Sequence, residues 1–214
     1  MPSFEYPSGV RFALENFIKA GYVELQKENY LFEEGTAEGA SKLAAKVRGV
    51  NICICNVDAK HIKCPFVSEE KSLGLKKSVD HIIFQCDESG VWHLHLLEMK
   101  TTVGTLTWHD IKQKVRASYM DMKAFAVFLG IDIRNENIHA YTTFENAKST
   151  TLADTTNPSL YKAPLGKEYT EPYPKEWNEG FINMDFDAPL RISHKKIQMT
   201  RSTPKAPLES SVII

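Results

Sequence analysis

The chain has 214 residues, of which 43% are hydrophobic and 25% are charged, and its formal net charge is −1 at pH 7. This length and apolar content suit one domain with a buried core plus extensions. The near-zero charge excludes a protein that attracts nucleic acid through its overall charge, so any polyanion must bind a local patch. No apolar run is long enough to cross a bilayer and no signal segment opens the sequence, so we expect a cytoplasmic protein without a membrane partner.

The first predicted element is a helix between Ser8, a possible cap, and Gly21, a stop signal. Four apolar residues follow helical spacing in it: Val10, Leu14, Phe17 and Ile18. The stretch from Tyr22 to Phe32 has mixed character and is typical of a short strand or a turn.

A second helix is expected from about Glu38 to Val47, with Thr36 as a possible cap. Its apolar residues share one helical face: Ala40, Leu43, Ala44 and Val47. The run from Asn51 to Val57 is rich in β-branched residues and predicts a strand. The polar, lysine-rich segment from Asp58 to Lys77 is typical of a mobile loop.

The strongest hairpin signal lies in residues 79–101, where two apolar runs flank a short polar loop. A loop of Glu88, Ser89 and Gly90, with the glycine in a left-handed conformation, sets Asp87 opposite Val91. This register predicts three apolar cross-strand pairs: Cys86 with Trp92, Phe84 with Leu94, and Ile82 with Leu96. The same register places Asp80 opposite Glu98. A loop longer by one residue would scramble both faces of the hairpin.

After Gly104, the tetrad from Thr107 to Asp110 resembles a capping box, and we expect an amphipathic helix from there to about Leu129. A last strand is predicted from Asn137 to Phe144. The order helix, three strands, helix, strand predicts an α/β sandwich with a central mixed sheet flanked by helices. Residues 1–148 would form this core, and residues 149–214, where prolines concentrate, an irregular extension with a short strand near Ile197.

Chemistry is predicted at the end of the hairpin, where Asp80, Glu98 and Lys100 would point to the same side. Two opposed carboxylates repel each other unless a positive charge stands between them. With the backbone carbonyl of Met99 they form an oxygen-rich site that suits Mg²⁺ or Mn²⁺. Such a metal would acidify a bound water and stabilise charge on a phosphate, which favours phosphodiester hydrolysis.

The sequence Val79-Asp80 followed by Glu98-Met99-Lys100 resembles the PD-(D/E)XK nuclease superfamily, with Val79 in the place of the proline. The resemblance implies a restriction-endonuclease-like fold, metal ligation by Asp80 and Glu98, and Lys100 as the catalytic lysine. It also implies a further acid from the first core helix, for which Glu38 is the candidate and Glu15 the second choice. Gln113 on the following helix would serve as an additional catalytic residue. The implied partner is nucleic acid, DNA rather than RNA, with a homodimer or a partner-protein complex as options.

Other interpretations stay open for several of these residues. A solvent-facing ion pair is the alternative for Glu98 and Lys100, and a catalytically inactive subunit that binds nucleic acid or protein is the alternative function for the fold. Zinc binding by Cys53, Cys55 and Cys64 is an alternative to buried reduced thiols.

The hairpin face opposite Asp80 and Glu98 carries polar residues that would form either a transition-metal site or a half-exposed polar face: His81, Gln85, His93 and His95. Cationic residues of the long helix would contact phosphates or be solvated: Lys112, Lys114, Arg116 and Lys123. Aromatic residues of the extension would pin it to the core or stack on bases: Tyr161, Tyr169, Tyr173 and Trp177.

Overall fold

The computed structural model describes residues 5–36, 39–57, 74–147, 172–184, 186, 188–203 and 206–214. The helices among these residues are α1 (Ser8–Asn16), α2 (Thr105–Phe128), α3 (Pro172–Glu179) and the 3-10 turn η3 (Asn135–Asn137). The strands, in chain order, are β1 (Glu24–Leu25), β2 (Asn29–Thr36), β3 (Gly39–Lys46), β4 (Val50–Ile54), β5 (His81–Cys86), β6 (Trp92–Met99), β7 (Thr102–Val103), β8 (Ile138–Phe144), β9 (Asn146–Ala147), β10 (Phe181–Met184), β11 (Leu190–Gln198) and β12 (Leu208–Ile213).

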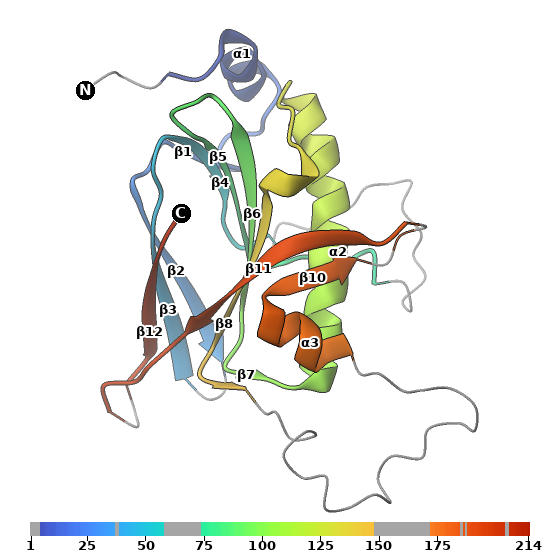
Figure 1. Ribbon diagram of the computed structural model, residues 1–214. Coiled ribbons are helices and arrows are strands. Elements are labelled where there is room, and N and C mark those ends of the chain that lie inside the picture. The colour runs from blue at the N-terminus through green and yellow to red at the C-terminus, as the bar shows by residue number, and fades with distance from the viewer. Residues whose placement is uncertain are drawn as a thin grey trace, which may run out of the picture.

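The fold is mixed α/β around a seven-stranded central sheet with the order β1-β4-β5-β6-β8-β11-β10 (Figure 1). Strands β1, β4, β5 and β6 are antiparallel neighbours, whereas β6, β8 and β11 run parallel and β10 is antiparallel at the far edge. Helix α2 connects the parallel strands β6 and β8. A second sheet has the order β12-β3-β2, and β7 pairs with β9. The predicted α/β class with a central mixed sheet is confirmed.

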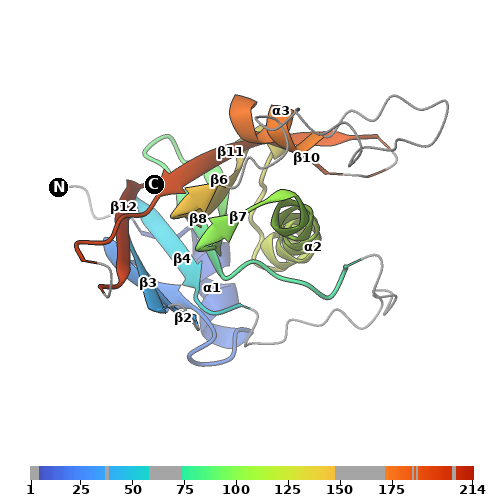
Figure 2. The same ribbon diagram turned by 90° about the horizontal axis from the view of Figure 1, so that it is seen from below.

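The central sheet lies between α2 on one face and the three-stranded sheet on the other (Figure 2). Strand side chains alternate between faces, so each strand contributes to two cores. Ile82 and Phe84 pack with Ile111 of α2, and α1 adds its buried face to the same core. Ile83 points the other way and packs with Leu43 of β3. Among the described residues, no helix is long and apolar enough to span a membrane.

The hairpin of β5 and β6 has the predicted register. Its three apolar pairs are those expected: Cys86 with Trp92, Phe84 with Leu94, and Ile82 with Leu96. Gly90 adopts a left-handed φ of 82°, and the Asp87 amide donates to the carbonyl of Val91 at 3.0 Å. The last ladder pair joins His81 to Leu97, so Asp80 and Glu98 lie one position further along. The loop chemistry therefore fixed the register as predicted.

The predicted helix from Glu38 to Val47 is wrong, because residues 39–46 form β3 between β2 and β12. Leu43, Ala45 and Val47 are buried in alternation, which is the period of a strand. The alanine-rich sequence is compatible with both the helical spacing of apolar residues and the alternation of a strand. The strand wins because β2 and β12 supply hydrogen-bonding partners on both sides.

The predicted irregular extension is wrong for the described part of residues 172–214, which form α3 and β10 to β12. The strand expected near Ile197 is confirmed, but it is longer and lies in the central sheet beside β8. The proposed boundary near residue 148 lies outside the described residues, as do Tyr161 and Tyr169. Ile192 and His194 are buried and their neighbours are exposed, which is the alternation of a strand. The prolines nearby had favoured an irregular segment instead.

Two helix ends also differ from the prediction. Helix α2 begins at Thr105 after Gly104, without a side-chain cap, so the tetrad that begins at Thr107 is inside the helix and is not a capping box. Helix α1 ends at Asn16, well before Gly21, and Phe17, which the pattern placed on its apolar face, is 58% exposed. The predicted end of α2 is confirmed by its last residue, Phe128.

Candidate functional site

Asp80 and Glu98 lie at one end of the apolar face that α2 covers. Along β6, the side chains of Leu94 and Leu96 belong to the core beneath α2, and Glu98 follows at the same period. Across the hairpin, Asp80 follows Ile82 in the same way. Both acids are almost fully buried, with 3% of Asp80 and 1% of Glu98 exposed. The predicted placement of the two carboxylates on one side is therefore confirmed.

Two ammonium groups meet these carboxylates. The Lys114 Nζ lies 2.7 Å from Glu98 Oε1 and 3.6 Å from Asp80 Oδ1, and the Lys100 Nζ lies 2.5 Å from Glu98 Oε1. The Met99 amide donates to Asp80 Oδ2 at 2.6 Å, and Lys100 donates to the Met99 carbonyl at 3.2 Å. Lys100 thus joins the acids as predicted, whereas Lys114 points inward rather than toward solvent.

One carboxylate oxygen of this cluster, Glu98 Oε2, is buried and has no hydrogen-bond partner among the described residues. Burial, together with the nearby Asp80 carboxylate, raises the pKa of Glu98 to about 7. Burial lowers the pKa of Lys114, but the Glu98 and Asp80 carboxylates outweigh it and raise that pKa above its ordinary value. A buried acceptor oxygen without a donor costs free energy, so this oxygen favours a bound cation.

A third acid, Glu34, belongs to the electrostatic environment of the cluster and was missed in the sequence. It lies near the end of β2, and burial and the Asp80 carboxylate raise its pKa to about 7, against the attraction of Lys100. Neither of the two residues predicted as the further acid of the site is seen at the cluster in the described part of the chain. Glu38 lies outside the described residues, and Glu15 is exposed on α1.

Gln113 hydrogen-bonds to Lys77 and His109 rather than to Asp80 or Glu98. Its Oε1 accepts from Lys77 Nζ at 2.8 Å, and its Nε2 lies 3.1 Å from His109 Nε2. Lys77 also pairs with Asp110 at 2.5 Å. Gln113 therefore belongs to a polar group one residue along α2 from Lys114, at the border of the cluster.

The other cations of α2 differ in what they contact. Lys112 pairs with the buried Glu176 at 3.0 Å, and Lys123 donates to the carbonyl of Ile133. These two side chains are engaged within the protein, so they do not form the solvated face that the sequence left open.

The expected half-exposed polar face opposite the acids is wrong for His81 and His95, which are buried. The His95 ring lies 2.9 Å from Gln85 Oε1 and 3.1 Å from the Tyr141 hydroxyl, and burial lowers its pKa well below its ordinary value. The cause is the sheet of β2, β3 and β12, which covers this side and was not foreseen. Both nitrogens of His95 have partners within the core, whereas His81 accepts from the Asn56 amide at Nδ1 and its buried Nε2 has no partner among the described residues.

The donor set limits which metal would fit. Within the described ranges, no group of three or more histidine, cysteine, aspartate and glutamate side chains is arranged to hold a metal ion. Asp80 and Glu98 provide two carboxylates, and the Met99 carbonyl is at the same place, so the ligands are oxygens. Of the proposed zinc ligands, Cys64 lies outside the described residues.

In comparisons with known proteins, no family model, no curated protein and no solved structure matches the chain.

Proposed function

We propose that this chain is a Mg²⁺- or Mn²⁺-dependent nuclease that hydrolyses phosphodiester bonds in DNA. The observation that carries the proposal is the buried, unpartnered Glu98 Oε2 beside Asp80, at the end of a hairpin that also presents Lys100. The order of β4, β5 and β6, then α2, then β8 parallel to β6 supports a restriction-endonuclease-like core. The choice of DNA rests on the resemblance to the PD-(D/E)XK superfamily.

The oxygen atoms of the cluster suit a hard divalent cation, although two ammonium groups contact the same carboxylates. Glu98 Oε2 has no hydrogen-bond partner among the described residues, Asp80 Oδ1 has the Lys114 ammonium 3.6 Å away, and the Met99 carbonyl would add a neutral ligand. Oxygen-only ligands with open positions for water suit Mg²⁺ or Mn²⁺. When bound, such a metal supplies a Lewis acid for the phosphate and lowers the pKa of a bound water.

The remaining side chains of the cluster would stabilise charge around the reacting phosphate. Lys100 is 25% exposed, so its ammonium reaches both Glu98 and solvent and can stabilise negative charge that develops on a phosphate oxygen. Lys114 holds Glu98 from the helix side. Glu34 takes the place proposed for Glu38 as the further acid, because its field reaches Asp80, Glu98 and both lysines.

Incubation of the purified chain with supercoiled plasmid and Mn²⁺ tests the proposal. Glu98→Gln and Lys100→Met should each lower the cleavage rate by about 100-fold or more, since each removes a charge that stabilises the transition state. Glu88→Gln is the matched control, because Glu88 is exposed at the other end of the same hairpin. Cleavage by Glu98→Gln at the wild-type rate would refute the assignment.

A second function is favoured by the charge balance of the cluster. Lys100 and Lys114 supply two positive charges to the two carboxylates, so the ion pairs are neutral as a group without a metal. This suits a catalytically inactive subunit that binds nucleic acid or protein. Tight binding of a DNA duplex in the presence of EDTA, with no cleavage when Mn²⁺ is restored, would support this second function over the first.

A further inference from the structure

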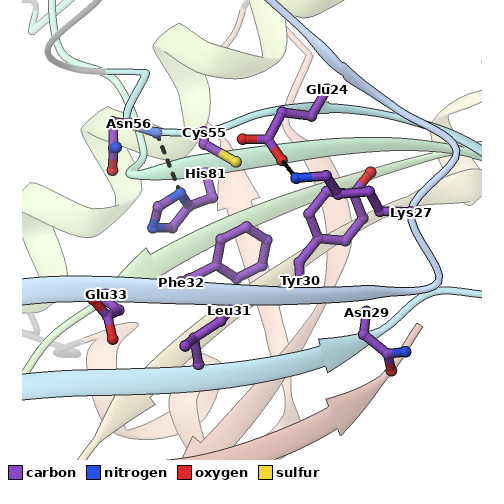
Figure 3. A pocket seen from close by; sticks show the side chains of 10 residues that line it. All are labelled: Glu24, Lys27, Asn29, Tyr30, Leu31, Phe32, Glu33, Cys55, Asn56 and His81. Atoms are coloured by element: carbon purple, nitrogen blue, oxygen red, sulfur yellow. Dashed lines mark hydrogen bonds and ion pairs between the residues drawn. The ribbon is translucent and has the colours of Figure 1, made fainter.

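A pocket of about 490 Å³ opens between β2 and the ends of β4 and β5, on the side away from α2 (Figure 3). Aromatic, charged and amide side chains line it together with one thiol, and among them are Tyr30, Phe32, Lys27, Asn56, His81 and Cys55. None of its lining residues belongs to the cluster of Asp80, Glu98 and Lys100. The function proposed above therefore leaves this pocket unused.

Two thiols meet at the wall of the pocket. The Cys53 Sγ lies 3.4 Å from the Cys55 Sγ, because residues two apart on a strand project to the same side. Cys53 is fully buried behind the pocket, with 0% of its surface exposed, whereas Cys55 is partly buried and lines the pocket. One thiol is thus reachable from solvent, and the second lies directly behind it.

Cys55 lies outside the strand ladder that holds Cys53. Strand β4 ends at Ile54, whose pairing with Ile82 is the last in the ladder between β4 and β5, so Cys55 lies beyond it. The next residue, Asn56, has a left-handed φ of 51° and turns the chain away. A disulfide needs an S–S distance of about 2.04 Å and Cα atoms roughly 4.4–6.8 Å apart. Two strand positions span roughly 6.6 Å, so a small shift of Cys55 suffices.

The surroundings favour the thiolate form of Cys55. The hydrogen bond from Cys53 lowers the pKa of Cys55 against the effect of burial, and His81 adds to the decrease, giving a pKa of about 6. The His81 ring is fixed beside it by stacking on Phe32, with ring centroids 4.2 Å apart, and by the Asn56 amide, which donates to Nδ1 at 3.3 Å. The thiolate is the reactive form of cysteine in oxidation and alkylation.

We propose that Cys53 and Cys55 form a redox-active dithiol site, in which a hydroperoxide entering the pocket oxidises Cys55 and Cys53 then closes an intramolecular disulfide. The Cys55 thiolate attacks the terminal peroxide oxygen, the O–O bond breaks, and hydroxide or alkoxide leaves with the electron pair, giving a sulfenic acid. The Cys53 thiol attacks that sulfur, and its proton leaves with the sulfenic hydroxyl as water. The two thiols lose two electrons and the peroxide gains them.

The sequence provides a direct readout on the intact chain. Trypsin cleavage after Arg48 and Lys60 places Cys53 and Cys55 in one peptide, and Cys86 falls in another. The reduced protein is treated with one equivalent of hydrogen peroxide, alkylated and digested. The proposal predicts that the 49–60 peptide loses about 2 Da and takes up no alkyl group. The Cys86 peptide should remain alkylated.

Alkylation of the reduced wild-type protein gives a second readout that needs no variant. Burial and Asp87 raise the pKa of Cys86, so that residue serves as the internal reference. At pH 7 the larger thiolate fraction of Cys55, partly offset by its weaker intrinsic nucleophilicity, predicts labelling at least about four-fold faster than that of Cys86. Equal or slower labelling of Cys55 would overturn its role as the reactive thiol.

Variants separate the two roles. Cys53→Ser should leave a Cys55 sulfenic acid that dimedone traps, and Cys55→Ser should prevent peroxide oxidation of the 49–60 peptide. Cys86→Ser, the matched control, should form the disulfide as the wild type does. Stable sulfinic acid at Cys55 in the wild type, a disulfide between two chains, or protection of both thiols by micromolar Zn²⁺ would each overturn the proposal, the last in favour of a metal site.

Discussion

Replacing Lys114 with methionine removes the cation that stands between Asp80 and Glu98. Its ammonium lies 2.7 Å from Glu98 Oε1, and the Glu98 side chain is 0% exposed, so the variant leaves buried charge poorly compensated. Breaking a buried ion pair from one side costs about 3–5 kcal/mol. Because Lys100 still contacts Glu98, we expect the lower end, a loss of about 3 kcal/mol in the free energy of unfolding at pH 8.

The loss should depend on pH with a defined sign. The pKa of Glu98 is raised to about 7 in the folded protein from an ordinary value of 4.5, so the folded state holds a proton between these values. Stability therefore falls as the pH rises through this window, and removal of Lys114 steepens the fall because it removes an attraction for the ionised form. At pH 5.5 the loss should shrink to less than about half of its value at pH 8.

Urea denaturation with EDTA present, at pH 5.5 and pH 8, measures both quantities. Lys123→Met is the matched control, because it removes a lysine of the same helix that contacts the Ile133 carbonyl rather than a carboxylate. Its cost should be equal at the two pH values. An equal loss at both pH values for Lys114→Met would refute the interpretation that Glu98 and Lys114 share this charge.

Three further predictions concern other parts of the fold. Gly49→Ala should destabilise the protein more than Gly90→Ala in urea melts. Both glycines have a left-handed φ, but an added Cβ at Gly49 would overlap the Cys86 carbonyl, whereas Gly90 has open space around it. Gly90→Ala should therefore lower the free energy of unfolding by only about 1 kcal/mol. Burial lowers the pKa of His194 to about 3, so stability should fall as the pH drops below about 6.5, and His194→Gln should flatten this dependence in urea midpoints at pH 7.5 and 5. Burial raises the pKa of Asp121 to about 6, so Asp121→Asn should raise the melting temperature at pH 8 but not at pH 4; equal shifts would contradict this.

The hairpin was predictable because its information is local. The loop that ends at Gly90 sets the register, and the register alone brings Asp80 and Glu98 to the same side of the sheet. The helical spacing of α2 also predicts that the Lys114 side chain points inward. It is three residues after Ile111 and four before Ser118, both of which are buried, so it lies on the buried stripe of α2.

The remaining features depend on contacts that are distant in sequence. Strand β3 has one partner close in sequence, β2, and one near the end of the chain, β12, and the alanine-rich sequence of β3 does not indicate the second pairing. The stacking of His81 on Phe32, and the position of Glu34 near the carboxylates, both depend on β2 of the second sheet lying against the central sheet. Tertiary context decides such segments, in which both the helical and the strand period fit the apolar residues.

Calorimetric titration of Mn²⁺ into the chelator-stripped protein tests most directly whether Asp80 and Glu98 form a metal site. We expect saturable binding by the wild type that disappears in Asp80→Asn and in Glu98→Gln and is retained in Glu88→Gln. Lys114→Met should bind Mn²⁺ more tightly than the wild type, because one of the two ammonium groups that compete for Glu98 is then removed and only Lys100 remains. Failure of the wild type to bind Mn²⁺, or equal binding by Asp80→Asn and Glu98→Gln, would contradict the proposed site.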